Sequence, residues 1–199
     1  MMYGMFYLET YHEVSSYLRK EQDMRKSKED WLEVGLKTLA RDGLGGLTIQ
    51  HMARKLRLTK GSFYHHFDNI VDYKRQLVAH WADQTLSTAF NAPEGPAAAL
   101  ALLDALMAEA YSPATETEVA IRTWAQQNEE VCAYVEKVDE VRRDFVFQVF
   151  LSLTGDDIQA GRMADLLLAM LIGSIMILPR YSSQQVSVLY AEFKHLYGL

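Results

Sequence analysis

Apolar residues recur at helical spacing along nearly the whole chain. Over residues 49–56, Ile49, Met52, Ala53 and Leu56 fall at positions i, i+3, i+4 and i+7, which form one face of an α-helix. No Asn-Gly or Asp-Gly hairpin separates runs of alternating polarity, and no internal repeat is evident. The pattern therefore predicts an all-α protein.

Capping and helix-breaking residues divide this pattern into elements. Ser27 precedes a helix over residues 27–41, which ends at the glycine-rich segment RDGLGG. Thr48 and Thr59 precede two short helices, and Asn69 precedes a long helix that is expected to reach Phe90. The segment NAPEGP at 91–96 reads as a linker, and further helices are expected near residues 97–111, 115–127, 129–153, 157–178 and 182–197. Asp156 or Asp157 is expected to cap the fourth of these, and Pro179 to end it.

Two short capped helices joined by a tight turn, after a longer helix, indicate a helix-turn-helix. The second helix of this motif lies in the major groove of DNA and reads base edges. Phe63 and Phe67 lie one turn apart and are expected to anchor this helix. Its exposed residues are then expected to be Lys60, Gly61, Ser62, Tyr64 and His65. Free amide groups at helix starts favour phosphate, which adds Thr48 and Thr59.

The charge is distributed in a way that fits a DNA-binding module. The chain has a net charge of −6, yet residues 24–75 carry 11 Lys and Arg against 6 Asp and Glu. Residues 76–199 carry 7 against 16. A basic module attracts phosphate, while an acidic body keeps the remainder of the protein off the polyanion.

The sequence gives little support for a metal site, a disulfide or an enzyme active site. His65 and His66 are adjacent, so their side chains diverge by roughly 100° on a helix, whereas helical metal ligands usually pair at i, i+4. The single cysteine, Cys132, excludes a cysteine zinc site and an internal disulfide and favours a reducing, cytoplasmic setting. The adjacent acidic pairs at 129–130 and 156–157 resemble helix caps. We therefore expect no metal, no cofactor and no enzymatic activity.

The most apolar run, Leu166 to Leu178, has 13 residues between Asp165 and Pro179. A membrane span needs about 20, so we expect a helix buried on most sides and no membrane association. The first residues lack the basic lead and cleavage site of a signal peptide. Residues 1–26 are expected to be either an added helix or a segment before a true start at Met24.

The segment LTIQHMARKLRLTKGSFYHHFDN resembles the DNA-binding segment of TetR-family (tetracycline-repressor-type) bacterial transcriptional regulators. The shared positions are Thr48, Ala53, Leu58, Gly61, Tyr64, His66 and Phe67. The resemblance is strong over about residues 27–80 and looser afterwards. It implies that Thr48, Tyr64 and His66 contact phosphates, whereas Lys60, Ser62 and His65 face the groove.

One position departs from the family pattern. Ile70 stands where the family usually has a lysine that contacts phosphate. Its absence implies weaker binding, or a transfer of the role to Lys74 or Arg75.

The resemblance also implies a domain organisation. Residues 27–75 would form the helix-turn-helix domain, and residues 76–199 a helical ligand-binding and dimerisation domain. The last two helices would pair with those of a second copy, because two half-sites on one face of DNA need a two-fold protein. The implied function is that of a repressor, released from a palindromic operator by a small-molecule effector. A DNA-binding adaptor without effector is the alternative.

Large or charged side chains in the acidic part are candidates for an effector site. They are Met107, Tyr111, Arg122, Trp124 and Phe145. Such residues are more often plain core. For Arg122 we favour a structural ion pair with Asp139 over a ligand anchor.

Overall fold

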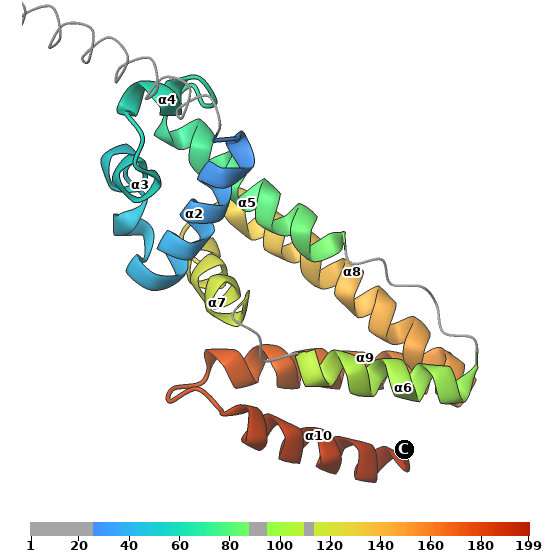
Figure 1. Ribbon diagram of the computed structural model, residues 1–199. Coiled ribbons are helices and arrows are strands. Elements are labelled where there is room, and N and C mark those ends of the chain that lie inside the picture. The colour runs from blue at the N-terminus through green and yellow to red at the C-terminus, as the bar shows by residue number, and fades with distance from the viewer. Residues whose placement is uncertain (1–25, 88–94, 110–113) are drawn as a thin grey trace, which may run out of the picture. The chain divides into compact units, whose positions relative to one another are not determined.

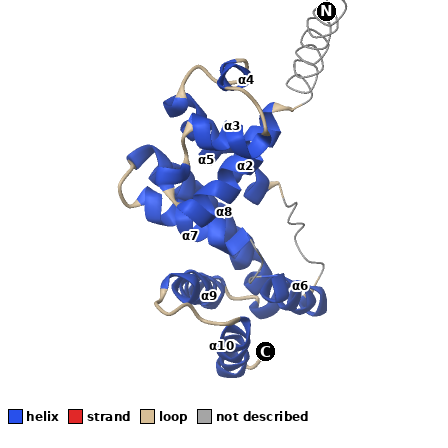
Figure 2. Ribbon diagram, turned by 60° about the vertical axis from the view of Figure 1, so that its left-hand side comes forward, coloured by secondary structure: helices blue, strands red, loops and turns tan. Residues whose placement is uncertain are grey.

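The computed structural model describes residues 26–87, 95–109 and 114–199. The described residues are helices and connecting turns, without strands, which confirms the all-α prediction (Figures 1 and 2). Two compact units divide the chain, one reaching to His80 and one formed by Trp81–Leu199. The expectations for the N-terminal extension, for the linker up to Glu94 and for Tyr111 fall outside the described residues.

The first unit is built from short helices with well-defined ends. They are α2 (Lys28–Asp42), the 3-10 turn η1 (Leu44–Gly46), α3 (Ile49–Leu56), α4 (Lys60–Tyr64) and the first part of α5 (Ile70–Leu86). Ser27 caps α2 in a reciprocal capping box with Asp30. The helix ends at Gly43, whose φ of +66° favours glycine. The predicted starts of these elements are therefore confirmed to within a residue or two. The second short helix was expected to continue to Asp68, but α4 ends at Tyr64, and α5 is described only to Leu86.

An aromatic cluster forms the core of this unit. The rings of Trp31 and Phe63 meet edge to face with centroids 5.4 Å apart, and those of Phe67 and Tyr73 do so at 4.9 Å. The Tyr73 hydroxyl donates a hydrogen bond of 2.8 Å to the Trp31 carbonyl. A Cβ atom at Gly35 would overlap this hydroxyl, so glycine permits the close approach of α2 and α5. The predicted core role of Phe63 and Phe67 is confirmed.

The second unit consists of longer helices. They are the end of α5, α6 (Pro96–Glu109), α7 (Ala114–Ala125), α8 (Glu129–Thr154), α9 (Asp157–Met176) and α10 (Ser183–Tyr197). Side chains from α6, α8, α9 and α10 share one hydrophobic core. Asp156, rather than Asp157, caps α9 by accepting hydrogen bonds from the amides of Ile158 and Gln159.

Helix α9 is less buried than its composition predicts. Only a third of its most apolar 18-residue window is buried, and Leu166 is 47% exposed. The expectation that this helix is buried on most sides is therefore wrong for the single chain, because α9 packs mainly on α8 and leaves apolar side chains uncovered. By length and composition alone, α9 could cross a membrane, but one such helix is weak evidence for a membrane span.

Candidate nucleic-acid interface

The start of α3 is held by Thr48. Its hydroxyl accepts a hydrogen bond of 3.2 Å from the amide of His51, and its backbone is extended (φ −114°, ψ 144°). The amides of Ile49 and Gln50, in the first turn, have no acceptor within the helix. Such amides, together with the helix dipole, favour an anion at this end. The geometry agrees with the predicted cap and is suited to a phosphate contact.

A tight turn sets the direction of α4. Arg57 adopts the left-handed conformation (φ 59°, ψ 36°), and its amide donates to the carbonyls of Ala53 and Arg54. The Leu58 amide donates to the Ala53 carbonyl at 2.8 Å. These bonds satisfy carbonyls that the end of α3 would otherwise leave free. The Thr59 hydroxyl then accepts from the amide of Ser62 at 3.3 Å and starts α4, as predicted.

Helix α4 separates its residues into an anchored side and an exposed side. Phe63 is fully buried, whereas Tyr64 is 58% exposed and meets Phe63 edge to face. His65 is exposed and His66 is half-buried. The structure therefore places the adjacent histidines in different environments.

The first turn of α4 is also exposed, with one exception. Thr59, Lys60 and Gly61 are all exposed. Ser62 was expected to be exposed and to face the groove, but it is only 4% exposed. The reason is geometric, because Ser62 lies three residues after Thr59 and next to Phe63, on the side by which this short helix is anchored.

The beginning of α5 carries the departure from the family pattern. Ile70 is half-buried, and the side chain of Asn69 caps the helix by accepting from the amides of Val71 and Asp72 at 2.9 and 3.0 Å. Arg75 donates to the carboxylate of Asp72 at 2.8 Å. Lys74 is half-buried one turn after Ile70, so it stays a candidate for the phosphate contact.

A polar cluster that the sequence did not suggest joins α2 to α3. Asp42 accepts from Lys55 at 3.0 Å and from Arg41 at 2.9 Å, and these hydrogen bonds hold the pKa of its carboxyl well below the ordinary value. The guanidinium of Arg54 lies 2.9 Å from Nδ1 of His51 and can only donate. Nε2 of His51 lies 3.2 Å from the carboxylate of Asp42 and is placed to donate to it.

This cluster fixes the orientation of α3 on α2 through polar contacts. Its residues are nine and thirteen positions apart, so no local spacing rule finds them. The signal for it in the sequence is the group of basic residues at the end of α3, which a count of net charge does not assign to any partner.

The comparisons with known proteins agree with this geometry. Residues 32–79 match the family model described as "Bacterial regulatory proteins, tetR family". The chain therefore carries a DNA-binding domain of the TetR type. The matched residues cover most of α2, all of η1, α3 and α4, and α5 up to residue 79.

Two solved structures share the fold of this chain. A transcriptional regulator from Rhodococcus sp. Rha1 is 20% identical, with a TM-score of 0.62 over 76% of this chain and 82% of that one. A proposed transcriptional regulator from Streptomyces coelicolor A3(2) is 15% identical, with a TM-score of 0.59 over 88% of this chain and 97% of that one. The comparison with curated proteins found no match.

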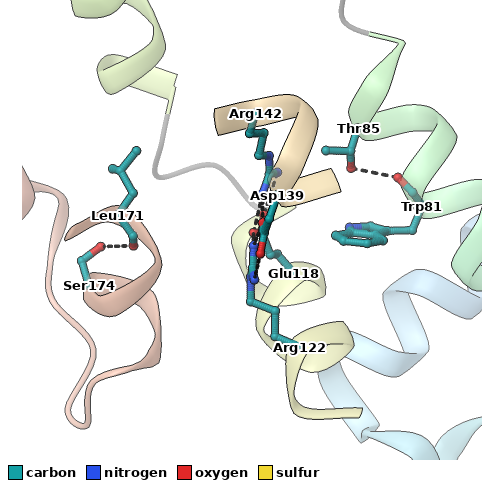
Figure 3. A network of polar contacts seen from close by, with 8 residues as sticks. All are labelled: Trp81, Thr85, Glu118, Arg122, Asp139, Arg142, Leu171 and Ser174. Carbon is teal, nitrogen blue, oxygen red and sulfur yellow. Dashed lines mark hydrogen bonds and ion pairs between the residues drawn. The ribbon is translucent and has the colours of Figure 1, made fainter. Parts of the chain in front are cut away.

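In the second unit of the regulator, four charged side chains join α7 to α8 (Figure 3). Arg122 is buried and donates to Asp139 at 2.8 Å and to Glu118 at 2.8 Å, while Arg142 donates to Glu118 at 2.6 Å. The favoured ion pair between Arg122 and Asp139 is therefore present. Burial alone would raise the pKa of Glu118, but the hydrogen bonds and charges of the two arginines outweigh it and lower the pKa.

The other effector candidates lie in two places. Trp124 is buried on α7. Met107 and Phe145 are partly buried and pack against the core shared by α6, α8, α9 and α10. Within the described ranges, no group of three His, Cys, Asp or Glu side chains could hold a metal ion.

Proposed function

We propose that this regulator is a homodimeric, cytoplasmic repressor that binds a palindromic operator and leaves it when a small molecule binds the second unit. The observation that carries the DNA-binding part is the arrangement of α4. Phe63 is buried and anchors the helix, while Lys60 and Tyr64 on the helix and His65 at its C-cap are exposed. A cation, a phenol and an imidazole in this position can contact phosphates and base edges.

The two-fold arrangement is supported by the last two helices. Apolar side chains remain exposed on both of them, among them Leu166 on α9 and Val188 and Leu196 on α10, the last being 74% exposed. Apolar surface of this kind on the last two helices is favourable to bury against a second copy. A dimer would present two α4 helices to half-sites about one helical turn of DNA apart.

Release by an effector follows from the same geometry. A molecule that binds the second unit lowers operator affinity only if it binds more tightly to a conformer in which the two α4 helices no longer match the half-sites. We expect such a molecule to act at the buried Trp124, the partly buried Phe145 or the cluster around Arg122.

The test is a gel-shift titration of the protein with duplexes from its own promoter region at several salt concentrations. Sequence-selective, salt-sensitive binding is expected. Tyr64→Ala and Lys60→Ala should each weaken it, whereas the control Cys132→Ala should not. Binding without sequence preference, or none at low salt, would contradict the proposal.

A further inference from the structure

Lys28, in the first turn of α2, lies beside the end of the recognition segment. Its ammonium group is 5.8 Å above the centroid of the Phe67 ring. Phe67 is buried and its ring contacts those of Phe63 and Tyr73, so its position is fixed by the core. A cation above an aromatic face is attracted by the ring quadrupole, which restricts an otherwise flexible lysine to this place.

Lys60 occupies the opposite end of the same segment. It is the first residue of α4, whereas Phe67 follows the last turn. Lys28, from α2, and Lys60, from α4, are therefore cations supplied by different helices at the two ends of the segment that carries Tyr64 and His65.

The charge of Lys28 is available for such a contact. Lys28 is exposed, and within the described part of the chain it makes no ion pair. Asp30, in the same turn, is already bound by the amide of Ser27 and by Lys26. A lysine held over a buried ring, with no ion pair to the described residues, is a suitable partner for phosphate.

We infer that Lys28 binds a phosphate of the DNA backbone beside the end of the recognition segment. Lys28 is thus a DNA-binding residue contributed by α2, outside the helix-turn-helix. The inference rests on the proposed DNA binding. Such a contact would supply a cation beside the end of the recognition segment. There α5 begins with the apolar Ile70, where the family usually has a lysine.

The salt dependence of DNA affinity tests this inference. Each phosphate contact contributes about −0.9 to the slope of log K against log salt concentration. Binding is measured by fluorescence anisotropy on a duplex selected by the protein from random sequence, and on a mixed-sequence duplex of about 30 base pairs, or three helical turns. Lys28→Ala should make the slope shallower by about one unit on both duplexes, and Lys28→Arg should restore it.

Lys37→Ala is the matched control. Lys37 is an exposed lysine of the same helix, nine residues after Lys28, and therefore lies on the opposite side of α2. Removing it should leave the slope unchanged. A role of Lys28 in folding alone would reduce the fraction of active protein and the unfolding temperature, but it would not change the slope.

The outcomes distinguish this inference from the proposed function. If the wild-type protein binds with a steep slope and Lys28→Ala keeps that slope, the inference is overturned and the proposed function stands. If the wild-type protein shows no salt-dependent binding, the proposed function itself fails.

Discussion

The two units of this chain differ in which kinds of side chain they bury and which they expose. In the first unit, apolar rings such as Phe63 and Phe67 are buried, and the side chains exposed on α4 are mostly polar or cationic. In the second unit, polar groups such as Arg122 are buried in a charged network, while Leu166 and Leu196 are exposed. The first pattern is that of a surface built for a polyanion. The second is the pattern that our proposal of a dimer requires, with apolar side chains free to pack against another chain.

The largest expected effect comes from the core of the first unit. Phe63→Ala should lower the free energy of unfolding by about 3–5 kcal/mol, because a fully buried ring is lost and a cavity remains. Urea unfolding followed by circular dichroism measures this change. DNA binding should be lost with the fold, and an unfolding free energy within about 0.5 kcal/mol of wild type would show that Phe63 is not an anchor.

The charged network of the second unit tests how much a buried polar cluster contributes to the free energy of unfolding. Arg122→Met leaves Glu118 and Asp139 with fewer partners and should destabilise the protein by about 3 kcal/mol. Because the folded-state pKa of Glu118 is lowered, its contribution is present above its ordinary pKa and is lost as the pH falls through the folded value. Thermal unfolding between pH 7 and about pH 3 should therefore show a smaller acid destabilisation in the variant.

The control for this prediction is an exposed ion pair between α8 and α9. Arg143 and Asp165 lie 2.6 Å apart near the surface. Arg143→Met should cost no more than about 1 kcal/mol. Equal losses of unfolding free energy in the two variants would show that the buried network stabilises the fold no more than the exposed pair.

The exposed apolar face of α9 and α10 should determine the oligomeric state. Leu166→Glu places a charge in the proposed contact between two copies, so it should raise the dimer dissociation constant at least about tenfold. Sedimentation velocity measures the proportion of dimer. Ile158→Glu, at the exposed start of α9, provides a comparison further from the middle of the helix. An unchanged dimer dissociation constant in Leu166→Glu would show that the interface lies on another face.

The smallest effect on stability is expected on α4. His65→Ala should weaken operator binding by about 1–3 kcal/mol, since a contact in the groove is lost. The unfolding free energy should change by less than about 0.5 kcal/mol, because His65 is exposed. Anisotropy titrations and urea unfolding on the same preparation separate the two quantities. A loss of stability equal to the loss of affinity would assign His65 to the core.

Local chemistry explains which features were predictable from the sequence. Thr48, Thr59 and Asn69 cap helices through bonds to amides two or three residues away, so their roles follow from short spacings. The same reasoning correctly separated Phe63 from Tyr64. It failed for Ser62, because its exposure depends on how a five-residue helix packs onto its neighbours.

Contacts between distant residues were beyond the sequence patterns. The cluster of Asp42, His51 and Lys55 joins two helices through side chains, and no periodicity indicates it. The apolar run in α9 correctly predicted a helix that requires burial. It could not say what covers the helix, because hydrophobicity favours burial without selecting the partner.

Binding to paired and single half-sites tests the central claim most directly. The measurement compares a selected palindromic duplex with the same duplex in which one half-site is scrambled, by sedimentation of the protein–DNA complexes. A two-fold regulator predicts two chains on the palindrome and an affinity for the half-site duplex lower by about 100-fold or more. One chain per duplex, with equal affinity for both duplexes, would contradict the account.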